Sequence, residues 1–482
     1  MPSPAESSLG NTLLHPVDLA LIGLYVTGLL YLGLRSRRPE GFAAQNYLLG
    51  GRRLTLVPFV ATLVSTWYGG ILGVGEFTYQ NGIVNLLVFG IPYYIFAALY
   101  AAFLAPRIRS GGALTIPERF HQHYGPGAAR FGAVLVFLLT TPAPYLLMLG
   151  VMLNFMFGLP LWSAILLGTI FSTIYLWRGG FLSVIRTDLL QFVLMFMGFA
   201  VLLGMLMGQE SLSEMWHRLP AGHRDLRGPE SMGWQVILVW FLIASWTFVD
   251  PGFYQRSAAA RDGKTAARGI FISVGFWLVF DLLTTATGLY AVSRLPDLAL
   301  QAGGSVAAYP LLGLSVLPVG LRGIFMVALL AVIMSTVDSF AFISATTIGR
   351  DFFLRQTDDV HAERKRIQWG IIVSCCVGYV LAVGFPSVVE LWYGLGMLLV
   401  PGLLLPVLAT FTSAFSLTDR SAIMVGSGGV ITAAAWQLIP QLARWLGASS
   451  GGYPLGLQPM IPGLLVTIVL AIIFGKIRYA AG

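Results

Sequence analysis

Long apolar segments, separated by short polar ones, recur along the whole chain. A helix that crosses a bilayer needs about 20 mostly apolar residues, because the hydrocarbon core is about 30 Å thick. The pattern predicts thirteen such helices, which we number 0 to 12 in chain order. Their expected ranges are 17–35, 55–80, 83–106, 128–157, 160–177, 182–208, 233–255, 268–293, 321–349, 367–384, 387–412, 421–443 and 459–475. We therefore expect an all-α polytopic membrane protein, with residues 1–482 forming a single transmembrane domain.

The composition supports this class and excludes others. Hydrophobic residues make up 56% of the chain and charged residues only 10%, whereas soluble domains carry about 25% charged residues. The longest segments between the expected helices lie around 209–232, 294–320 and 350–366, and each is too short to fold as a nucleotide-binding domain. An ATP-driven pump is therefore not expected within this chain.

The net charge is +8, and the positions of the charges predict an orientation. Cytoplasmic segments of membrane proteins collect Lys and Arg. If the N-terminus lies outside, the cytoplasmic segments and adjoining helix ends hold 23 of the 29 Lys and Arg residues, with clusters within 35–53, 256–268 and 364–366. We expect an outside N-terminus and a cytoplasmic C-terminus in a cell membrane, such as a bacterial inner membrane. The basic residues have no interleaved aromatics, so a lipid bilayer and not a nucleic acid is the expected partner.

The expected helix 321–349 is unusually polar for its depth in the membrane. At about 100° per residue, Ser335, Asp338 and Ser339 share one face of this helix, and Thr336 lies on its shoulder. Hydroxyls in a membrane helix commonly bond the carbonyl one turn back, but that habit does not explain a carboxylate. Clustered oxygens with one acid are the ligands that a small hard cation prefers. This face is therefore predicted to line an ion site.

The expected helix 182–208 offers a second buried acid, Asp188. In the predicted orientation Asp188 lies near the cytoplasmic end of its helix, at a depth that Asp338 can also reach. Ionisable groups inside a membrane are costly and usually functional. The alternative is a local ion pair between Arg186 and Asp188.

Two expected helices contain residues that interrupt helical structure. Helix 1 (55–80) carries Gly69 and Gly70 at mid-membrane, and helix 6 (233–255) carries Asp250-Pro251-Gly252. Proline removes a helix donor and glycine weakens a helix. Interruptions at matching places in two halves are typical of transporters built from inverted repeats. We therefore predict core repeats at 55–208 and 233–412, with an extra N-terminal helix at 17–35, extra C-terminal helices at 421–475, and a binding site beside the breaks.

Several motifs resemble those of a known family. They are YLLGGRRL at 47–54, TIPE at 115–118, the segment from the glycine pair to the glutamine at 179–191, QR at 255–256 and IMSTVDS at 333–339. In this order they are similar to the signature of the sodium/solute symporter family, and with the thirteen spans the resemblance covers nearly the whole chain. It implies a LeuT-type core with helices 1 and 6 broken, and cotransport of sodium with a small organic solute by alternating access.

The resemblance also implies particular ion ligands. Position by position, the main sodium site would use the hydroxyls of Ser335 and Thr336 and the backbone carbonyls of Val332, Ser65 and Tyr68. Some members of the family hold a second sodium ion deeper in the protein.

The residues at the matching positions of that second site are Asp188, Asp338 and Ser339. An aspartate at 338 departs from the family pattern. It leaves three possibilities open: a second sodium ion, a proton, or no second ion. Sodium is thus the expected coupling ion, and proton coupling is the alternative.

The solute is expected at mid-membrane beside the two breaks. Residues at the positions that face solute in relatives are Trp67, Tyr68, Leu72, Asp250 and Phe253. The polar helix 1 pattern of the sugar branch is missing, so a sugar is not expected. An acidic residue has no evident packing role, so Asp250 favours an amine-bearing solute, unless it is protonated or paired with Arg256. The alternative for Trp67 and Phe253 is that they only pack the bundle.

Other function classes remain as alternatives. A transporter-like channel or receptor would share the fold but not the coupled flux. A membrane enzyme is not expected, because all six histidines fall in expected loops or tails and an intramembrane Ser-His dyad cannot form. No partner chain is indicated, so we expect a working monomer.

Overall fold

The computed structural model describes residues 14–34, 44–177, 180–229, 232–298, 304–353, 360–385, 387–413, 415–446 and 453–477. Gly179 and the arginines at 35–38, which entered the motifs and the charge count, lie outside these residues.

Helices account for most of the described chain. The first half contains α1 (Pro16–Leu34), α2 (Ala44–Leu49), η1 (Gly50–Arg52), α3 (Leu56–Trp67), η2 (Tyr68–Gly70), α4 (Ile71–Asn81), η3 (Gly82–Val84), η4 (Leu86–Gly90), α5 (Ile91–Leu99), η5 (Tyr100–Leu104), α6 (Ala105–Ser110), α7 (Ile116–His123), α8 (Pro126–Leu139), α9 (Ala143–Phe157), α10 (Leu161–Leu176) and α11 (Phe181–Gln209). The second half contains α12 (Leu212–Arg218), α13 (Ala221–Arg224), α14 (Gly233–Ile243), η6 (Ala244–Phe248), α15 (Pro251–Ala259), α16 (Gly263–Arg294), η8 (Gly304–Ala307), α17 (Ala308–Val316), α18 (Leu321–Thr346), η9 (Thr347–Asp351), α19 (Val360–Gly384), α20 (Val388–Ala409), α21 (Asp419–Trp445), η10 (Pro454–Gly456) and α22 (Met460–Phe474). Two short strands, β1 (Phe415–Ser416) and β2 (Lys476–Ile477), pair antiparallel.

Ten helical segments of the described chain are long and apolar enough to cross a membrane. Each overlaps one of the thirteen predicted spans. The other three predicted spans, 17–35, 160–177 and 459–475, coincide with the shorter apolar helices α1, α10 and α22. The all-α polytopic prediction is confirmed, while the number thirteen stays a prediction.

The segment 294–320, expected to be a loop, contains η8 and the buried helix α17. Both pack beside α4, and Tyr309 of α17 donates a hydrogen bond to the backbone oxygen of Thr284 at 2.8 Å. This helix was missed because it is too short to produce the hydropathy signal of a membrane span. It extends the bundle at the end that the charge distribution predicts to be outside.

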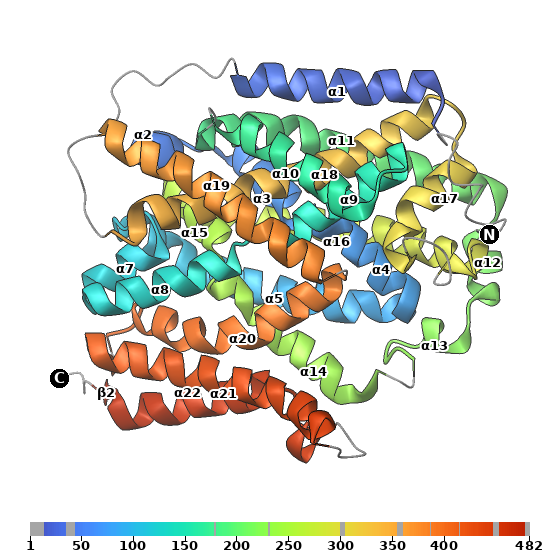
Figure 1. Ribbon diagram of the computed structural model, residues 1–482. Coiled ribbons are helices and arrows are strands. Elements are labelled where there is room, and N and C mark those ends of the chain that lie inside the picture. Colours follow the sequence, from blue (N-terminus) through green and yellow to red (C-terminus); the bar gives the residue numbers. More distant parts are fainter. Residues whose placement is uncertain are drawn as a thin grey trace.

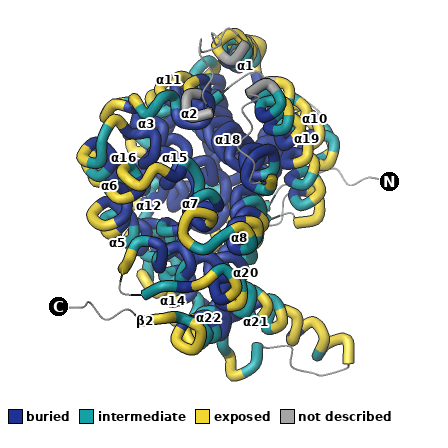
Figure 2. The backbone as a smooth tube through the Cα atoms, turned by 90° about the vertical axis from the view of Figure 1, so that its left-hand side faces the viewer, coloured by how far each residue is buried: buried dark blue, intermediate teal, exposed yellow. Residues whose placement is uncertain are grey.

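The helix α18 lies at the centre of the bundle. Figure 2 shows it surrounded by buried backbone, with α1 on one edge of the molecule and α21 and α22 at the opposite one. In its most apolar stretch 94% of residues are buried, against 28% for α21. Figure 1 shows the same order, with α1 along one side and α20 to α22 along the other.

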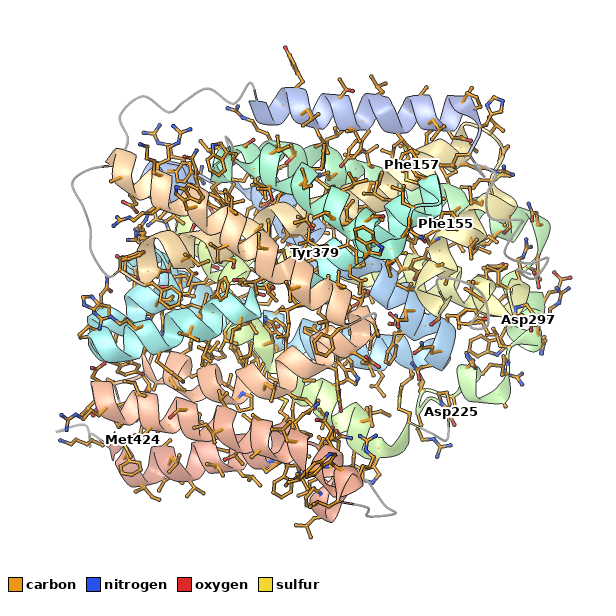
Figure 3. The ribbon with its side chains drawn as sticks, viewed as in Figure 1. Phe155, Phe157, Asp225, Asp297, Tyr379 and Met424 are labelled. Atoms are coloured by element: carbon orange, nitrogen blue, oxygen red, sulfur yellow. The ribbon has the colours of Figure 1, made fainter. Side chains whose placement is uncertain are left out.

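Apolar side chains also cover the outside of the bundle. Phe157, labelled at the end of α9 in Figure 3, is 51% exposed. The charged Asp225 and Asp297 lie instead beyond the helix ends, on the side away from the C-terminus. Apolar flanks with charges at the ends are what a bilayer requires.

Both predicted breaks are present. Helix 1 is divided into α3 and α4 by the 3₁₀ turn η2. Helix 6 is divided into α14 and α15 by the 3₁₀ segment η6 and by Asp250, whose backbone is extended (φ −69°, ψ 116°). Pro251 then begins α15, where a missing backbone N–H costs nothing.

Candidate functional site

The break in helix 1 lies directly against α18. The Thr336 hydroxyl donates a hydrogen bond to the backbone oxygen of Thr66 at 2.7 Å. A Cβ atom at position 69 would lie only 1.7 Å from Thr336 Oγ1, so glycine is required there for the two helices to approach this closely. A backbone carbonyl at the end of α3 and a hydroxyl of α18 thus meet in a fully buried position.

Ser335 faces the same contact from α18. Its hydroxyl donates to Asp188 Oδ1 at 2.7 Å and lies 3.2 Å from the hydroxyl of Ser65. The backbone oxygen of Val332 lies 3.5 Å from Thr336 Oγ1, one turn back along α18. The structure therefore brings together Ser65, Val332, Ser335 and Thr336. Tyr68 is the first residue of η2, directly after the end of α3. Its hydroxyl does not take part in the contact with α18, because it donates a hydrogen bond to the backbone oxygen of Trp277 at 2.8 Å.

Asp188 enters this contact from α11 and is fully buried. Besides Ser335, it accepts a hydrogen bond from Thr62 of α3. Its ionic partner is Arg256 of α15, at 3.8 Å, whereas Arg186 is exposed. Asp188 is therefore paired with an arginine of another helix, and not with Arg186 of its own helix as the alternative assumed.

Arg256 links three hydroxyls around Asp188. Its Nη2 atom lies within hydrogen-bond distance of Thr66 Oγ1 (2.6 Å), Ser339 Oγ (2.9 Å) and Thr62 Oγ1 (3.0 Å), which share the two hydrogens of this nitrogen. The side chain of Arg256 is 1% exposed. Ser339 therefore belongs to the same cluster as Asp188, where its hydroxyl accepts from a guanidinium.

Asp338 is fully buried on α18. The helix α1 packs against both α18 and α11, and the hydroxyl of its Tyr25 accepts a hydrogen bond from Gln191 of α11 at 3.1 Å. The contribution of α1 to this region was not predicted, because an outlying helix gives no sequence signal of its contacts.

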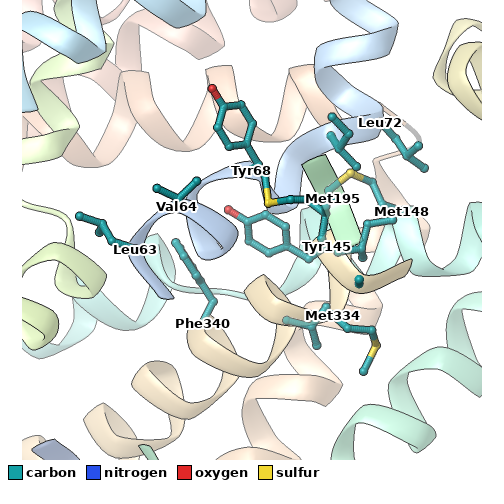
Figure 4. Close-up of a cluster of buried hydrophobic side chains, with 14 of the residues drawn as sticks. Leu63, Val64, Tyr68, Leu72, Tyr145, Met148, Met195, Met334 and Phe340 are labelled. Atoms are coloured by element: carbon teal, nitrogen blue, oxygen red, sulfur yellow. The ribbon is translucent and has the colours of Figure 1, made fainter. Parts of the chain in front are cut away.

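A cavity of about 110 Å³ lies beside the two breaks. Trp67, Tyr68, Asp250 and Phe253, four of the five predicted solute residues, line it. Trp67 contacts Phe253 edge to face, with ring centroids 5.6 Å apart. Leu72 does not line it. Figure 4 shows Leu72 in a buried hydrophobic cluster with Met148 and Met195.

Asp250 has a structural role that the sequence did not reveal. Its carboxylate accepts a hydrogen bond from the backbone N–H of Phe253 at 2.8 Å, so it caps the N-terminus of α15. The expectation that an acidic residue has no packing role here was therefore wrong, since aspartate is among the best helix caps. The same carboxylate still faces the cavity.

A sequence model of the sodium:solute symporter family matches residues 47–413 of the chain. The chain belongs to this family. It is 26% identical over 388 residues to the sodium/myo-inositol cotransporter 2 of Mus musculus, covering 70% of this chain and 56% of the relative. It is 24% identical over 501 residues to the sodium/proline symporter 2 of Staphylococcus saprophyticus, covering 96% and 88%. The chain thus spans little more than half the length of its mammalian relatives.

Solved structures support the LeuT-type fold. A Na⁺-coupled sialic acid symporter superposes with a TM-score of 0.74 at 16% identity, covering 96% of this chain and 99% of that one. The nucleobase-cation-symport-1 family transporter Mhp1 superposes with a TM-score of 0.52 at 14% identity, covering 86% and 92%. These likenesses concern the fold alone, and the family consists of transporters and not of enzymes.

Several residues that line the cavity were not predicted from the sequence. They are mainly aromatic. Five come from other helices, namely Phe89, Tyr93, Tyr145, Phe340 and Trp392, whereas Trp240 and Trp246 belong to helix 6 itself, in α14 and η6. Trp392 of α20 reaches the break because position 70 is a glycine, where a Cβ atom would lie 1.8 Å from the indole ring. The only sequence signal for these residues was aromatic content, which membrane helices also use for packing.

Proposed function

We propose that this chain is a sodium-coupled symporter that moves a small organic solute by alternating access. The observation that carries the proposal is the oxygen-lined contact between the broken helix 1 and α18, which adjoins an aromatic cavity at the same break. Ion and solute would then bind to the same movable elements. Coupling requires such an arrangement, because each ligand must favour the same conformation.

The main sodium ion would bind at the helix 1 and α18 contact. Its proposed ligands are the hydroxyls of Ser335 and Thr336 and the backbone oxygens of Val332, Ser65 and Tyr68. The donor set suits sodium because every atom is a neutral oxygen and the position is buried. The hydrogen bond from Thr336 to Thr66 holds the two helices together, and rotation of the hydroxyl would turn its lone pairs toward a cation.

The solute would occupy the aromatic cavity. Trp67, Tyr68 and Phe253 would contact its apolar body, and Asp250 a cationic or hydrogen-bonding end. Leu72 does not line the cavity, so we propose only that it packs behind these aromatic residues. The apolar lining supports the expectation that a sugar is not the solute, since sugars require many hydrogen-bonding partners.

The orientation and the working unit belong to the same proposal. We propose an outside N-terminus and a cytoplasmic C-terminus in a bacterial inner membrane, with a monomer as the functional unit. The positive charges near the ends of α6, α7 and α19 support this orientation.

Uptake into proteoliposomes tests the function. The reconstituted chain is given radiolabelled proline, pantothenate or myo-inositol, solutes named in its relatives, under an inward sodium gradient, an inward proton gradient or neither. Accumulation that requires sodium supports the proposal. Accumulation driven by protons alone indicates a proton symporter, equilibration without a gradient indicates a channel, and binding without flux indicates a receptor.

A variant of Asp338 tests whether a proton or a further ion takes part. Asp338→Asn is expected to change the pH dependence of uptake or the number of sodium ions per solute, because the carboxylate is fully buried on α18, three residues from Ser335, whose hydroxyl contacts Asp188. A variant that matches the wild type in flux, stoichiometry and pH profile would assign Asp338 to the structure of the bundle.

A further inference from the structure

A pocket of about 390 Å³, separate from the aromatic cavity, opens on the surface where α3 and α16 begin. Its walls come from the start of α3 and from residues 261–268, and the two helices pack side by side (Figure 2). Three basic side chains line it, Arg261, Lys264 and Arg268, together with one acidic side chain, Asp262. The pocket is therefore positively charged, with three positive charges against one negative charge.

The one carboxylate of the pocket already has partners within the chain. Asp262 accepts a hydrogen bond from the backbone N–H of Thr265 at 2.7 Å, which caps the N-terminus of α16, and it pairs with Arg261 at 3.3 Å. Lys264 and Arg268 are one turn apart on α16, where like charges repel each other. Neither takes part in an ion pair among the residues that the structure describes. An anion from outside the chain would bind both of them and relieve this repulsion.

Exposed apolar side chains adjoin these charges. Val57 of α3 lines the pocket and is 72% exposed. On α16, Phe271 and Ile272 follow Arg268 by three and four residues, so they continue the same helix face, and both are exposed. In a bilayer such side chains contact lipid chains, and the charged ends of helices lie among the lipid headgroups. The pocket thus lies where a headgroup and its chains can both be bound, which distinguishes a lipid from a free phosphate ion.

The pocket also adjoins the ends of both broken helices. The backbone N–H of Leu54 donates to the backbone oxygen of Ala259 at 3.1 Å, and that of Arg261 donates to the backbone oxygen of Leu54 at 2.9 Å. The segment before α3 is thereby joined to the segment after α15. A ligand that contacts Thr55 at the start of α3 and the basic residues of α16 would favour this arrangement over others, because it binds only where the two elements are close.

We propose that this pocket binds the headgroup phosphate of an anionic phospholipid, and that the bound lipid stabilises the arrangement of α3, α15 and α16 seen here. Lys264 and Arg268 bind the phosphate, and the apolar side chains beside them contact the acyl chains. A zwitterionic lipid carries the same phosphate with a compensating positive charge, so it binds more weakly. The site lies outside the ion and solute sites and does not depend on the proposed function.

Thermal unfolding of the full-length protein tests the proposal without ion gradient or solute. The delipidated protein in detergent is titrated with phosphatidylglycerol, with phosphatidylcholine of the same chains, or with soluble glycerol 3-phosphate. Phosphatidylglycerol is expected to raise the unfolding temperature with a saturable dependence, and the other two to raise it much less. In Lys264→Gln combined with Arg268→Gln, the half-saturating amount of phosphatidylglycerol is expected to increase at least about tenfold.

Arg130→Gln combined with Arg420→Gln is the matched control, because it removes two exposed positive charges near the first turns of α8 and α21, outside the pocket. It is expected to respond to phosphatidylglycerol as the wild type does. Equal stabilisation of the wild type by both lipids overturns the proposal and needs no variant to fold. Equal stabilisation by glycerol 3-phosphate assigns the pocket to a free phosphate ester and overturns the lipid. A control that loses as much as the pocket variant reduces the effect to total charge and also overturns the site.

Discussion

Replacing Gly69 by alanine is expected to disrupt the proposed main sodium site. The added Cβ atom would lie 1.7 Å from Thr336 Oγ1, 2.0 Å from its Cβ and 2.7 Å from its Cγ2. Rotation of the threonine cannot relieve this, because its Cβ itself is too close. Carbon atoms in contact need about 3.5 Å, so the two helices must separate by on the order of 1 Å or more.

The separation has two measurable costs. The hydrogen bond from Thr336 to Thr66, now 2.7 Å long, would exceed the length at which such a bond holds. Overpacking typically costs about 1–3 kcal/mol and a buried hydrogen bond about 1 kcal/mol, while alanine returns about 1 kcal/mol of helix propensity. We expect Gly69→Ala to lower the free energy of unfolding by about 1–3 kcal/mol, and to raise the sodium concentration at half saturation at least about tenfold.

Thermal unfolding of the purified protein, titrated with sodium chloride and with potassium chloride, measures both effects. Gly204→Ala is the matched control: it makes the same change inside α11, where a Cβ atom would meet nothing within 4 Å. The control is expected to keep the sodium response of the wild type. If Gly69→Ala folds and its half-saturating sodium concentration stays within about twofold of the wild type, the contact at Thr336 does not hold sodium.

Three further predictions concern the proposed sodium ligands, the cap of α15 and a buried ion-pair cluster. Changing Ser335 and Thr336 together to alanine should raise half-saturating sodium at least about tenfold, equivalent to about 1.4 kcal/mol; an unchanged sodium titration would refute their role. Asp250→Asn should keep the cap of α15, because asparagine caps well, yet weaken binding of a cationic solute while sodium-dependent thermal stabilisation persists. Collapse of sodium binding instead would place Asp250 in the ion path. Arg350 of η9 forms ion pairs at 3.1–3.4 Å with Glu118, Asp351 and Glu363. Arg350→Met should lower the free energy of unfolding by about 3–5 kcal/mol in a denaturation experiment, because it leaves these three carboxylates together. Arg227→Met, which breaks an exposed pair, should change it little, and equal effects would contradict the reasoning.

The architecture could be predicted because a bilayer imposes strong rules on sequence. Each spanning helix must be long and apolar, and interruptions in it stand out as glycine pairs or Asp-Pro-Gly. The breaks of helices 1 and 6 were therefore visible, and so was the polar face of α18. The helix α17 was not visible, because a short helix buried among others follows no such rule.

The candidate site could be predicted only as far as residues follow one another along a helix. Ser335, Thr336 and Ser339 share a turn, so their grouping needed no tertiary information. The aromatic cavity wall could not be found in this way, because Tyr145, Trp240 and Trp392 come from three helices far apart in the chain. The helix cap at Asp250 was missed for a local reason: the break was identified from Pro251, but the carboxylate was interpreted as a contact with the solute, as a protonated group or as a partner of Arg256, and not as a cap.

Arg256 shows most clearly why charge cannot be interpreted from position alone. In the sequence it stands at the cytoplasmic end of helix 6, next to Arg261 and Lys264, and it was counted with them as a positive-inside charge. In the structure Arg261 and Lys264 line a surface pocket, whereas Arg256 turns inward and is fully buried. The difference arises because its counter-charge, Asp188, comes from a helix 68 residues earlier, and only the packing of α11 against α3 and α18 brings that carboxylate within reach. A buried arginine without that carboxylate would be strongly destabilising, so the two residues must be interpreted as one unit. Any account of how many ions this chain moves therefore has to begin from the pair, and not from Asp188 alone.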